Sequence, residues 1–236
     1  QFGKFWRTYQ HMPWYQQEVA INKQLAEKLG FLKVSEMKSF VAHEIEKYVL
    51  NGGFLFAMCA ATDTYDISLA AAGVDICAPM FDGDPADPNA GEKLNFSRTF
   101  AFENFRLEKS PYEYEFSNID ATRTRNVPRE NDYFTLFDFS AKWDPIPTML
   151  CQNHNNLVKG FMGQTTAYRK EVLKPNVLIL GENKPAREAR YIHGEQGKGF
   201  WTFYGGHDPE DYRHLIGDPP TDLNLHPNSP GYRLIL

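Results

Sequence analysis

The chain has 236 residues, with 25 Lys and Arg against 30 Asp and Glu, so its formal net charge at pH 7 is −5. Hydrophobic residues make up 42% and aromatic residues 14% of the sequence, which excludes a disordered chain. No apolar stretch approaches the roughly 20 residues of a transmembrane segment, and the acidic balance argues against nucleic-acid binding. The three cysteines, Cys59, Cys77 and Cys151, form no C-x-x-C pair, so we expect neither a disulfide scaffold nor a cysteine-rich zinc site.

The first part of the chain predicts two helices. Residues 1–17 are rich in aromatic side chains and read as irregular, and helical spacing begins at Glu18 and continues to Leu29. The clearest helix is Ser35 to Leu50, in which apolar residues recur three or four positions apart.

A strand and a third helix follow a Gly-Gly turn. The unbroken apolar run Gly53–Met58 is typical of a buried parallel strand. Cys59 follows it, and Tyr65–Ala72 predicts the next helix. Further along, short β-like runs occur at Thr99–Phe102, Tyr112–Phe116, Tyr133–Phe139 and Asn176–Leu180.

The last predicted elements are two strands and a tail. Ala189–His193 and Gly199–Tyr204 predict a hairpin that turns at Gly194–Lys198. The tail, residues 208–233, is polar and rich in proline, and it predicts a loop.

Cys59 is the first candidate for chemistry, because it stands between the predicted strand and helix. A helix N-terminus points its amides and its positive dipole end at such a position, which favours a thiolate. The backbone amide near Ala60 can supply an oxyanion hole. The alternative interpretation is a small buried residue with no chemical role, which is common for free cysteine.

The second candidate is His207, directly after the predicted strand Gly199–Tyr204 and a Gly-Gly pair. Either Asp208 or Glu210 could orient its imidazole, and the spacing does not choose between them. The alternative is a turn in which Asp208 caps local amides and His207 is a solvated loop residue.

These segments resemble a known superfamily. The run Asn51–Cys59 after an amphipathic helix is similar to the nucleophile segment of class I glutamine amidotransferase-like proteins, and Tyr191–Glu210 looks like the final strands and His turn of the ThuA-like branch. The whole chain resembles the carboxyl-terminal part of Bacteroidetes proteins labelled "asparagine synthetase B". The resemblance implies a flavodoxin-like three-layer α/β sandwich with a mostly parallel sheet, with earlier strands before Gln1, and an extracytoplasmic location in the periplasm or at the outer membrane.

The sequence departs from the superfamily pattern in three ways. Ala57 and Ala61 replace the glycines that usually lie two residues before and after the nucleophile. His207 and Glu210 are one residue further apart than in the usual His-Pro-Glu. ThuA-like members generally lack a working Cys triad. The label "asparagine synthetase" finds no support, because no Ser-Gly-Gly-x-Asp-Ser loop is present.

We expect no metal and no cofactor. Asp82, Asp84, Asp87 and Asn89 place oxygen atoms close together, but their spacing does not match an EF-hand. The acidic group around His207, including His214, is weak evidence for a metal site.

Two functions follow from these predictions. The chain, read as one domain over 1–236 with a large β-rich insertion at about 78–176, is either a Cys-dependent amide hydrolase or a non-catalytic ThuA-like binding module or subunit of an extracytoplasmic assembly. A missing N-terminal segment or a partner chain would complete the sheet, and no nucleic acid is expected.

Overall fold

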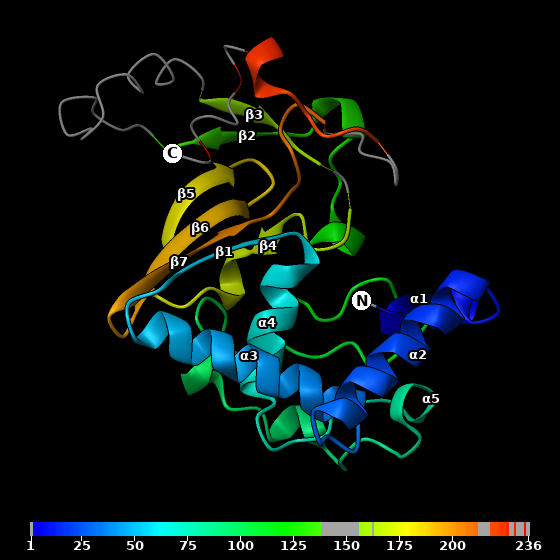
Figure 1. Ribbon diagram of the computed structural model, residues 1–236. Helices are drawn as coiled ribbons and strands as arrows, with labels where there is room; N and C mark the ends of the chain where they lie inside the picture. Colours follow the sequence, from blue (N-terminus) through cyan, green and yellow to red (C-terminus); the bar gives the residue numbers. More distant parts are fainter. Residues whose placement is uncertain are drawn as a thin grey trace.

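The computed structural model describes residues 2–137, 156–161, 163–211 and 218–226, together with Ser229 and Leu234. The predictions for Cys151 and His214, and for the last two residues of the run Tyr133–Phe139, lie outside these residues. In Figure 1 the helices gather on one side of a curled sheet. Within the described ranges, no helix has both the length and the apolar character to cross a bilayer.

The clearest predicted helix, Ser35–Leu50, is confirmed, and the structure adds helices that the sequence analysis did not predict. The helix predicted from Ser35 is α3, and its first turn is closed by Glu36, whose carboxylate accepts the amides of Leu32 and Lys33 at 3.2 and 3.3 Å. The prediction that residues 1–17 are irregular is wrong, because helices cover most of them. Pro13 occupies the first position of one of these helices, which is favourable for proline. The α-helices are α1 (Phe2–Tyr9), α2 (Pro13–Lys28), α3 (Val34–Leu50), α4 (Ala60–Ala70) and α5 (Pro79–Asp82). The 3-10 turns are Ala90–Glu92, Phe96–Arg98, Thr122–Thr124, Arg129–Asn131, Lys170–Val172 and Leu223–Leu225.

A single mixed sheet organises the strands. They are β1 (Phe54–Met58), β2 (Tyr133–Leu136), β3 (Leu157–Lys159), β4 (Tyr168–Arg169), β5 (Leu178–Asn183), β6 (Glu188–Gln196) and β7 (Gly199–Tyr204). Their order is β1-β7-β6-β5-β2-β3, with β4 paired to β6. Of the described pairings, β1 with β7 is parallel and all others are antiparallel.

The flavodoxin-like sandwich with a mostly parallel sheet is therefore wrong. Short connections explain the difference: β6 and β7 are joined at Gly197 and Lys198, and β5 and β6 at residues 184–187. Turns this short can join only antiparallel strands, whereas parallel strands need a crossover of a dozen or more residues. The chain between β1 and β7 is long enough for such a crossover, and there the pairing is parallel.

The segment 78–176 is not a separate β-rich insertion. Its first part, up to Asp132, consists of α5, 3-10 turns and loops, and the runs Thr99–Phe102 and Tyr112–Phe116 are not strands. Its strands β2, β3 and β4 belong to the same sheet as the rest of the chain. Thr99–Phe102 instead enters the core, because Asp66 caps its backbone amides.

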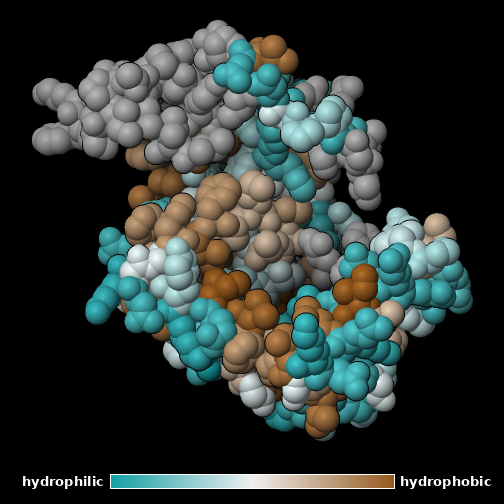
Figure 2. Space-filling view, viewed as in Figure 1, coloured by the Kyte–Doolittle hydropathy of each residue, from teal (hydrophilic) through white to brown (hydrophobic). Residues whose placement is uncertain are grey.

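One face of the sheet packs on the helices, and part of the other is exposed. Trp201 and Phe203 lie in the main core with residues of α3 and α4. On the opposite face, Phe54 and Phe56 of β1 are 45% and 39% exposed, and Phe54 stacks on Phe200 at 4.8 Å between ring centroids. The strand β1, which was predicted to be buried, is thus an edge strand. Figure 2 shows that side chains over the sheet form an apolar surface.

Candidate active site

Cys59 occupies a sharp turn between β1 and α4, as the sequence predicts. Its φ of 54° and ψ of −139° fall where residues other than glycine are rarely found, at a cost of about 1–3 kcal/mol. The Cys59 amide donates to the carbonyl oxygen of Tyr204 at 3.0 Å, and the Thr62 hydroxyl donates to the carbonyl oxygen of Cys59 at 2.7 Å. A strained residue held between a strand and a helix has the geometry of a nucleophile elbow.

The environment of Cys59 raises the pKa of its thiol and so favours the protonated form. Burial raises its pKa, and the charges of Asp63 and Asp120 raise it further, whereas the Ala60 amide at the start of α4 acts in the opposite direction. Desolvation outweighs the amide, so the pKa of the thiol moves in the direction opposite to the one that the expected helix-stabilised thiolate requires. The sulfur donates a hydrogen bond to the carbonyl oxygen of Gln164 at 3.0 Å. A nucleophilic role for this thiol therefore requires a base that removes its proton.

His207 leaves the sheet at the same edge as Cys59. β1 and β7 run parallel with Met58 opposite Tyr204, so Cys59 follows its strand directly and His207 comes three residues after the neighbouring one. The imidazole is half-buried and packs on Phe161, with ring centroids 4.2 Å apart. The topology thus brings together two segments that are about 150 residues apart.

The two candidate orienting acids make other contacts. The Asp208 carboxylate accepts the amide of Glu210 at 2.9 Å, which is the local cap considered in the alternative interpretation. The Glu210 carboxylate pairs with His226 Nδ1 at 3.3 Å. The orientation of His207 by either acid stays a prediction.

Two buried carboxylic acids beside Cys59 were missed from the sequence. Asp63 is fully buried, and within the described part of the chain neither of its oxygens has a hydrogen-bond partner. Burial raises its pKa well above the ordinary value, and Asp120 adds to that rise. Asp120 accepts the amides of Thr122 and Thr165 at 2.8 and 2.7 Å, yet burial raises its pKa too. The spacing of Asp63 from Cys59, one helical turn, was a usable signal, whereas only the fold places Asp120.

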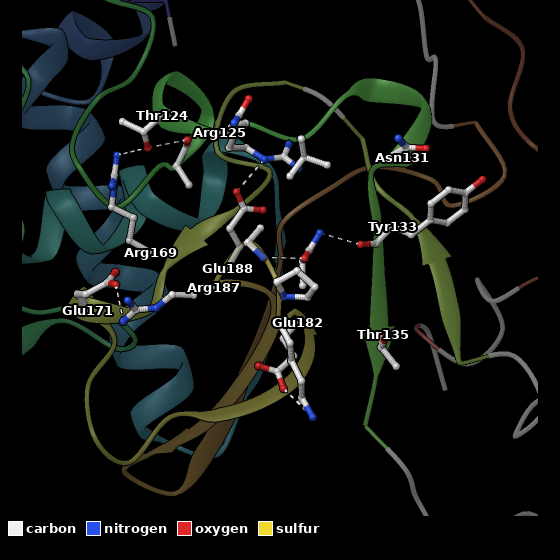
Figure 3. Close-up of a pocket in the computed structure, with 17 residues that line it drawn as sticks. Thr124, Arg125, Asn131, Tyr133, Thr135, Arg169, Glu171, Glu182, Arg187 and Glu188 are labelled. Atoms are coloured by element: carbon white, nitrogen blue, oxygen red, sulfur yellow. Dashed lines mark hydrogen bonds and ion pairs between the residues drawn. The ribbon is translucent and has the colours of Figure 1, made fainter.

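A cavity of about 950 Å³ lies next to the Asp120 segment in the chain (Figure 3). Its wall begins at Ala121, and most of its lining side chains are polar or charged. Arg169 stands out, since its guanidinium donates to the Thr124 hydroxyl at 2.5 Å while its buried Nε has no partner among the described residues. Glu171 pairs instead with Arg187 at 3.4 Å. The cavity therefore offers a cationic group to an anionic ligand.

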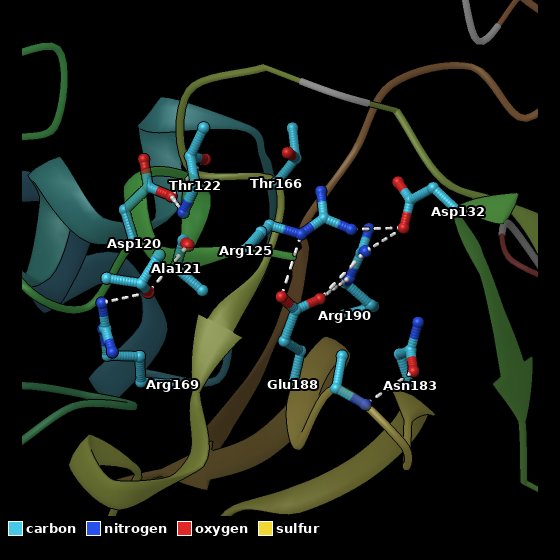
Figure 4. Close-up of polar contacts among 12 residues, drawn as sticks. Asp120, Ala121, Thr122, Arg125, Asp132, Thr166, Arg169, Asn183, Glu188 and Arg190 are labelled. Carbon is cyan, nitrogen blue, oxygen red and sulfur yellow. Dashed lines mark hydrogen bonds and ion pairs between the residues drawn. The ribbon is translucent and has the colours of Figure 1, made fainter. Parts of the chain in front are cut away.

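A buried ion network fixes one wall of this cavity (Figure 4). Arg190 donates to Asp132 at 2.5 Å and to Glu188 at 3.1 Å, and Arg125 bridges the same two acids. All four side chains are 5% exposed or less. Two cations thus balance two anions, and a rigid neutral wall results.

The acidic loop that we considered for calcium does not gather its oxygens around one point. The Asp84 carboxylate holds the Lys33 ammonium at 2.6 Å, and the Asp87 carboxylate accepts the Asp75 amide at 3.2 Å. Asp82 instead lies with Asp75 and Cys77.

Comparison of the chain with protein-family models, with curated proteins and with solved structures returned no match. The geometry of the Cys59 turn and its neighbours is therefore the basis for assigning a function to the chain.

Proposed function

We propose that the chain is a cysteine-dependent hydrolase of carboxamides, related to the class I glutamine amidotransferase-like proteins through its strand–Cys–helix segment and its His turn. In this proposal Cys59 is the nucleophile, His207 is the base and the Ala60 amide contributes to the oxyanion hole. The observation that carries it is the positive φ of Cys59 at the carboxyl end of β1, beside its parallel neighbour β7, which leads to His207.

The proposed reaction follows from the protonated thiol. His207 takes the proton from Cys59 as the sulfur attacks the carboxamide carbon, and the carbonyl oxygen gains the negative charge that the Ala60 amide stabilises. The C–N bond then breaks, and His207 returns the proton to the leaving amine. Water, activated by the same imidazole, hydrolyses the thioester and restores the thiol. Asp208 or Glu210 would orient the imidazole.

Alkylation kinetics test this proposal within one molecule. Iodoacetamide labelling, followed by mass spectrometry of peptides, compares Cys59 with Cys77, whose thiol burial also protects. We expect faster labelling of Cys59, and a loss of at least about tenfold in His207→Gln, because a positioned base contributes roughly 10²–10⁴-fold. Equal labelling in the native protein and in His207→Gln would contradict the proposed pair.

The exposed apolar face of the sheet favours a second candidate, a non-catalytic subunit of an assembly. β1 is an edge strand, and Phe54, Phe56 and Met58 are each at least 39% exposed on one of its faces. Apolar edge strands are rarely left uncovered. This candidate predicts slow, His207-independent labelling of Cys59. The extracytoplasmic location, the missing segment or partner chain and the absence of nucleic-acid binding stay predictions.

A further inference from the structure

Three potential metal ligands meet where the chain after α4 returns to the start of α3. Asp75, Cys77 and Asp82 each offer one ligand atom, and these atoms all lie within 4.8 Å of one another. The ligands of a single zinc ion, with bonds of about 2.0–2.3 Å, lie at similar or slightly shorter separations. The backbone holds part of this arrangement, because Asp75 accepts the Cys77 amide at 2.8 Å.

The burial of Asp82 is a second, independent observation that points to a bound cation. Its side chain is 4% exposed, and its Oδ1 atom is buried without a hydrogen-bond partner among the described residues. Its other oxygen accepts only a 3.3 Å bond from the Ser35 hydroxyl, and the Lys33 ammonium lies 3.8 Å away. A buried carboxylate is costly unless it is paired or coordinates a metal, and among the described residues Asp82 has only this long ion pair with Lys33.

The local charge balance points the same way. Three carboxylates, those of Asp75, Asp82 and Asp84, surround one cation, Lys33. Three negative charges and one positive charge leave an excess of −2, which attracts a divalent cation. The Lys33 ammonium already has a closer partner than Asp82, since it donates to both carboxylate oxygens of Asp84 at 2.6 Å.

We propose that Asp75, Cys77 and Asp82 bind a divalent cation of the zinc class. A set of one sulfur and two carboxylate oxygens suits a borderline-soft ion, whereas magnesium and calcium select oxygen ligands alone. Binding forms the metal–sulfur bond as the Cys77 thiol proton passes to the solvent, and the ion displaces the Lys33 ammonium from Asp75. A water molecule or the Ser35 hydroxyl completes the coordination. This site is independent of the proposed hydrolase activity.

Cadmium reports on the sulfur ligand directly. Metal-free protein titrated with Cd²⁺ should develop the ultraviolet charge-transfer band of a cadmium–thiolate bond, saturating at one equivalent, and calorimetry with Zn²⁺ should give the same stoichiometry. The Cys77→Ser variant should lose the band. Asp82→Asn, which keeps the shape of the side chain, should weaken Zn²⁺ binding by at least about tenfold, the lower end of the loss seen even for outer-shell partners.

Matched variants keep the result specific to this cluster. The double variant Cys59→Ser/Cys151→Ser should retain the band, because the proposed site takes its sulfur ligand from Cys77. Lys33→Gln should strengthen Zn²⁺ binding, since it removes the cation that competes for Asp75, whereas a merely structural ion pair would give no such gain. Circular dichroism of each variant without metal checks its fold. A band that persists in Cys77→Ser, no band in the native protein, or unchanged affinity in Asp82→Asn would overturn the proposal.

Discussion

The backbone amide of Cys59 donates a 3.0 Å hydrogen bond to the carbonyl oxygen of Tyr204, which ties the turn after β1 to the last residue of β7. This bond continues the parallel ladder by one position beyond the paired residues Met58 and Tyr204. It thereby fixes the point at which both chains leave the sheet. The strained turn and the segment that carries His207 are consequences of the same pairing.

The strain at Cys59 predicts that glycine is preferred there for stability. Cys59→Gly should be more stable than Cys59→Ala by about 1–2 kcal/mol, because glycine adopts the observed dihedrals without the 1–3 kcal/mol penalty but loses part of that gain to backbone entropy. Both variants lose the sulfur bond to Gln164, so the comparison isolates the backbone. Urea denaturation of the pair measures the difference. An alanine variant as stable as the glycine variant would show that the turn is unstrained.

The buried carboxyl group of Asp63 should make the folded protein less stable as the pH rises. Its pKa is raised in the folded protein, so its contribution to stability is present below the unfolded value near 3.8 and is lost as pH rises through the folded value. Asp63→Asn, which carries no charge, should be more stable than the native protein at pH 8, by at least about 1 kcal/mol. The advantage should shrink at pH 4. Thermal denaturation of both proteins at pH 4 and pH 8 measures this difference in stability. The prediction is contradicted if the native protein becomes more stable relative to Asp63→Asn as the pH rises.

Asp66 is predicted to be essential for the loop at Phe100. Its buried carboxylate accepts the amides of Phe100, Ala101 and Phe102 at 2.8, 2.7 and 2.9 Å. Asp66→Ala should destabilise by at least about 3 kcal/mol, because each buried amide left unsatisfied costs about 1–3 kcal/mol. Asp66→Asn keeps one acceptor oxygen and should lose less. Denaturant midpoints of the two variants should therefore differ, and equal midpoints would rule out the capping role.

The buried ion network predicts a large effect of single substitutions. Arg190→Met should destabilise by about 3–5 kcal/mol, because it leaves Asp132 and Glu188 with one cation between them. Arg123→Met is the control: its side chain is 52% exposed and its surface ion pairs are worth about 0–1 kcal/mol. Adding Glu188→Gln to Arg190→Met should recover part of the loss. A single variant as mild as the control would show that the pairs contribute little.

The sequence by itself determined the local elements around the proposed nucleophile. The periodicity of Ser35–Leu50 and the hairpin ending at Tyr204 appear as α3 and the β6–β7 pair, because each depends on contacts between residues near in sequence. The apolar run before Cys59 appears as β1, although its strand partner, β7, is distant in the sequence. The aromatic start was misread as irregular. The apolar residues of α2 form no clear stripe, whereas Phe2, Phe5, Trp6 and Tyr9 of α1 do recur at helical spacing and were a usable signal. The resemblance to a parallel sandwich did not survive, because the short turns that join β5, β6 and β7 fix antiparallel pairing.

Tertiary structure alone decided what surrounds Cys59 and Cys77. Asp120, Gln164 and Thr165 reach the Cys59 turn from segments more than 60 residues away. The burial of the thiol, together with the charges of Asp63 and Asp120, raises its pKa. Asp82 loses its solvent only because the loop after α4 folds back on the start of α3. Burial and charge proximity depend on which distant segments pack together, and no local pattern of residues encodes that packing.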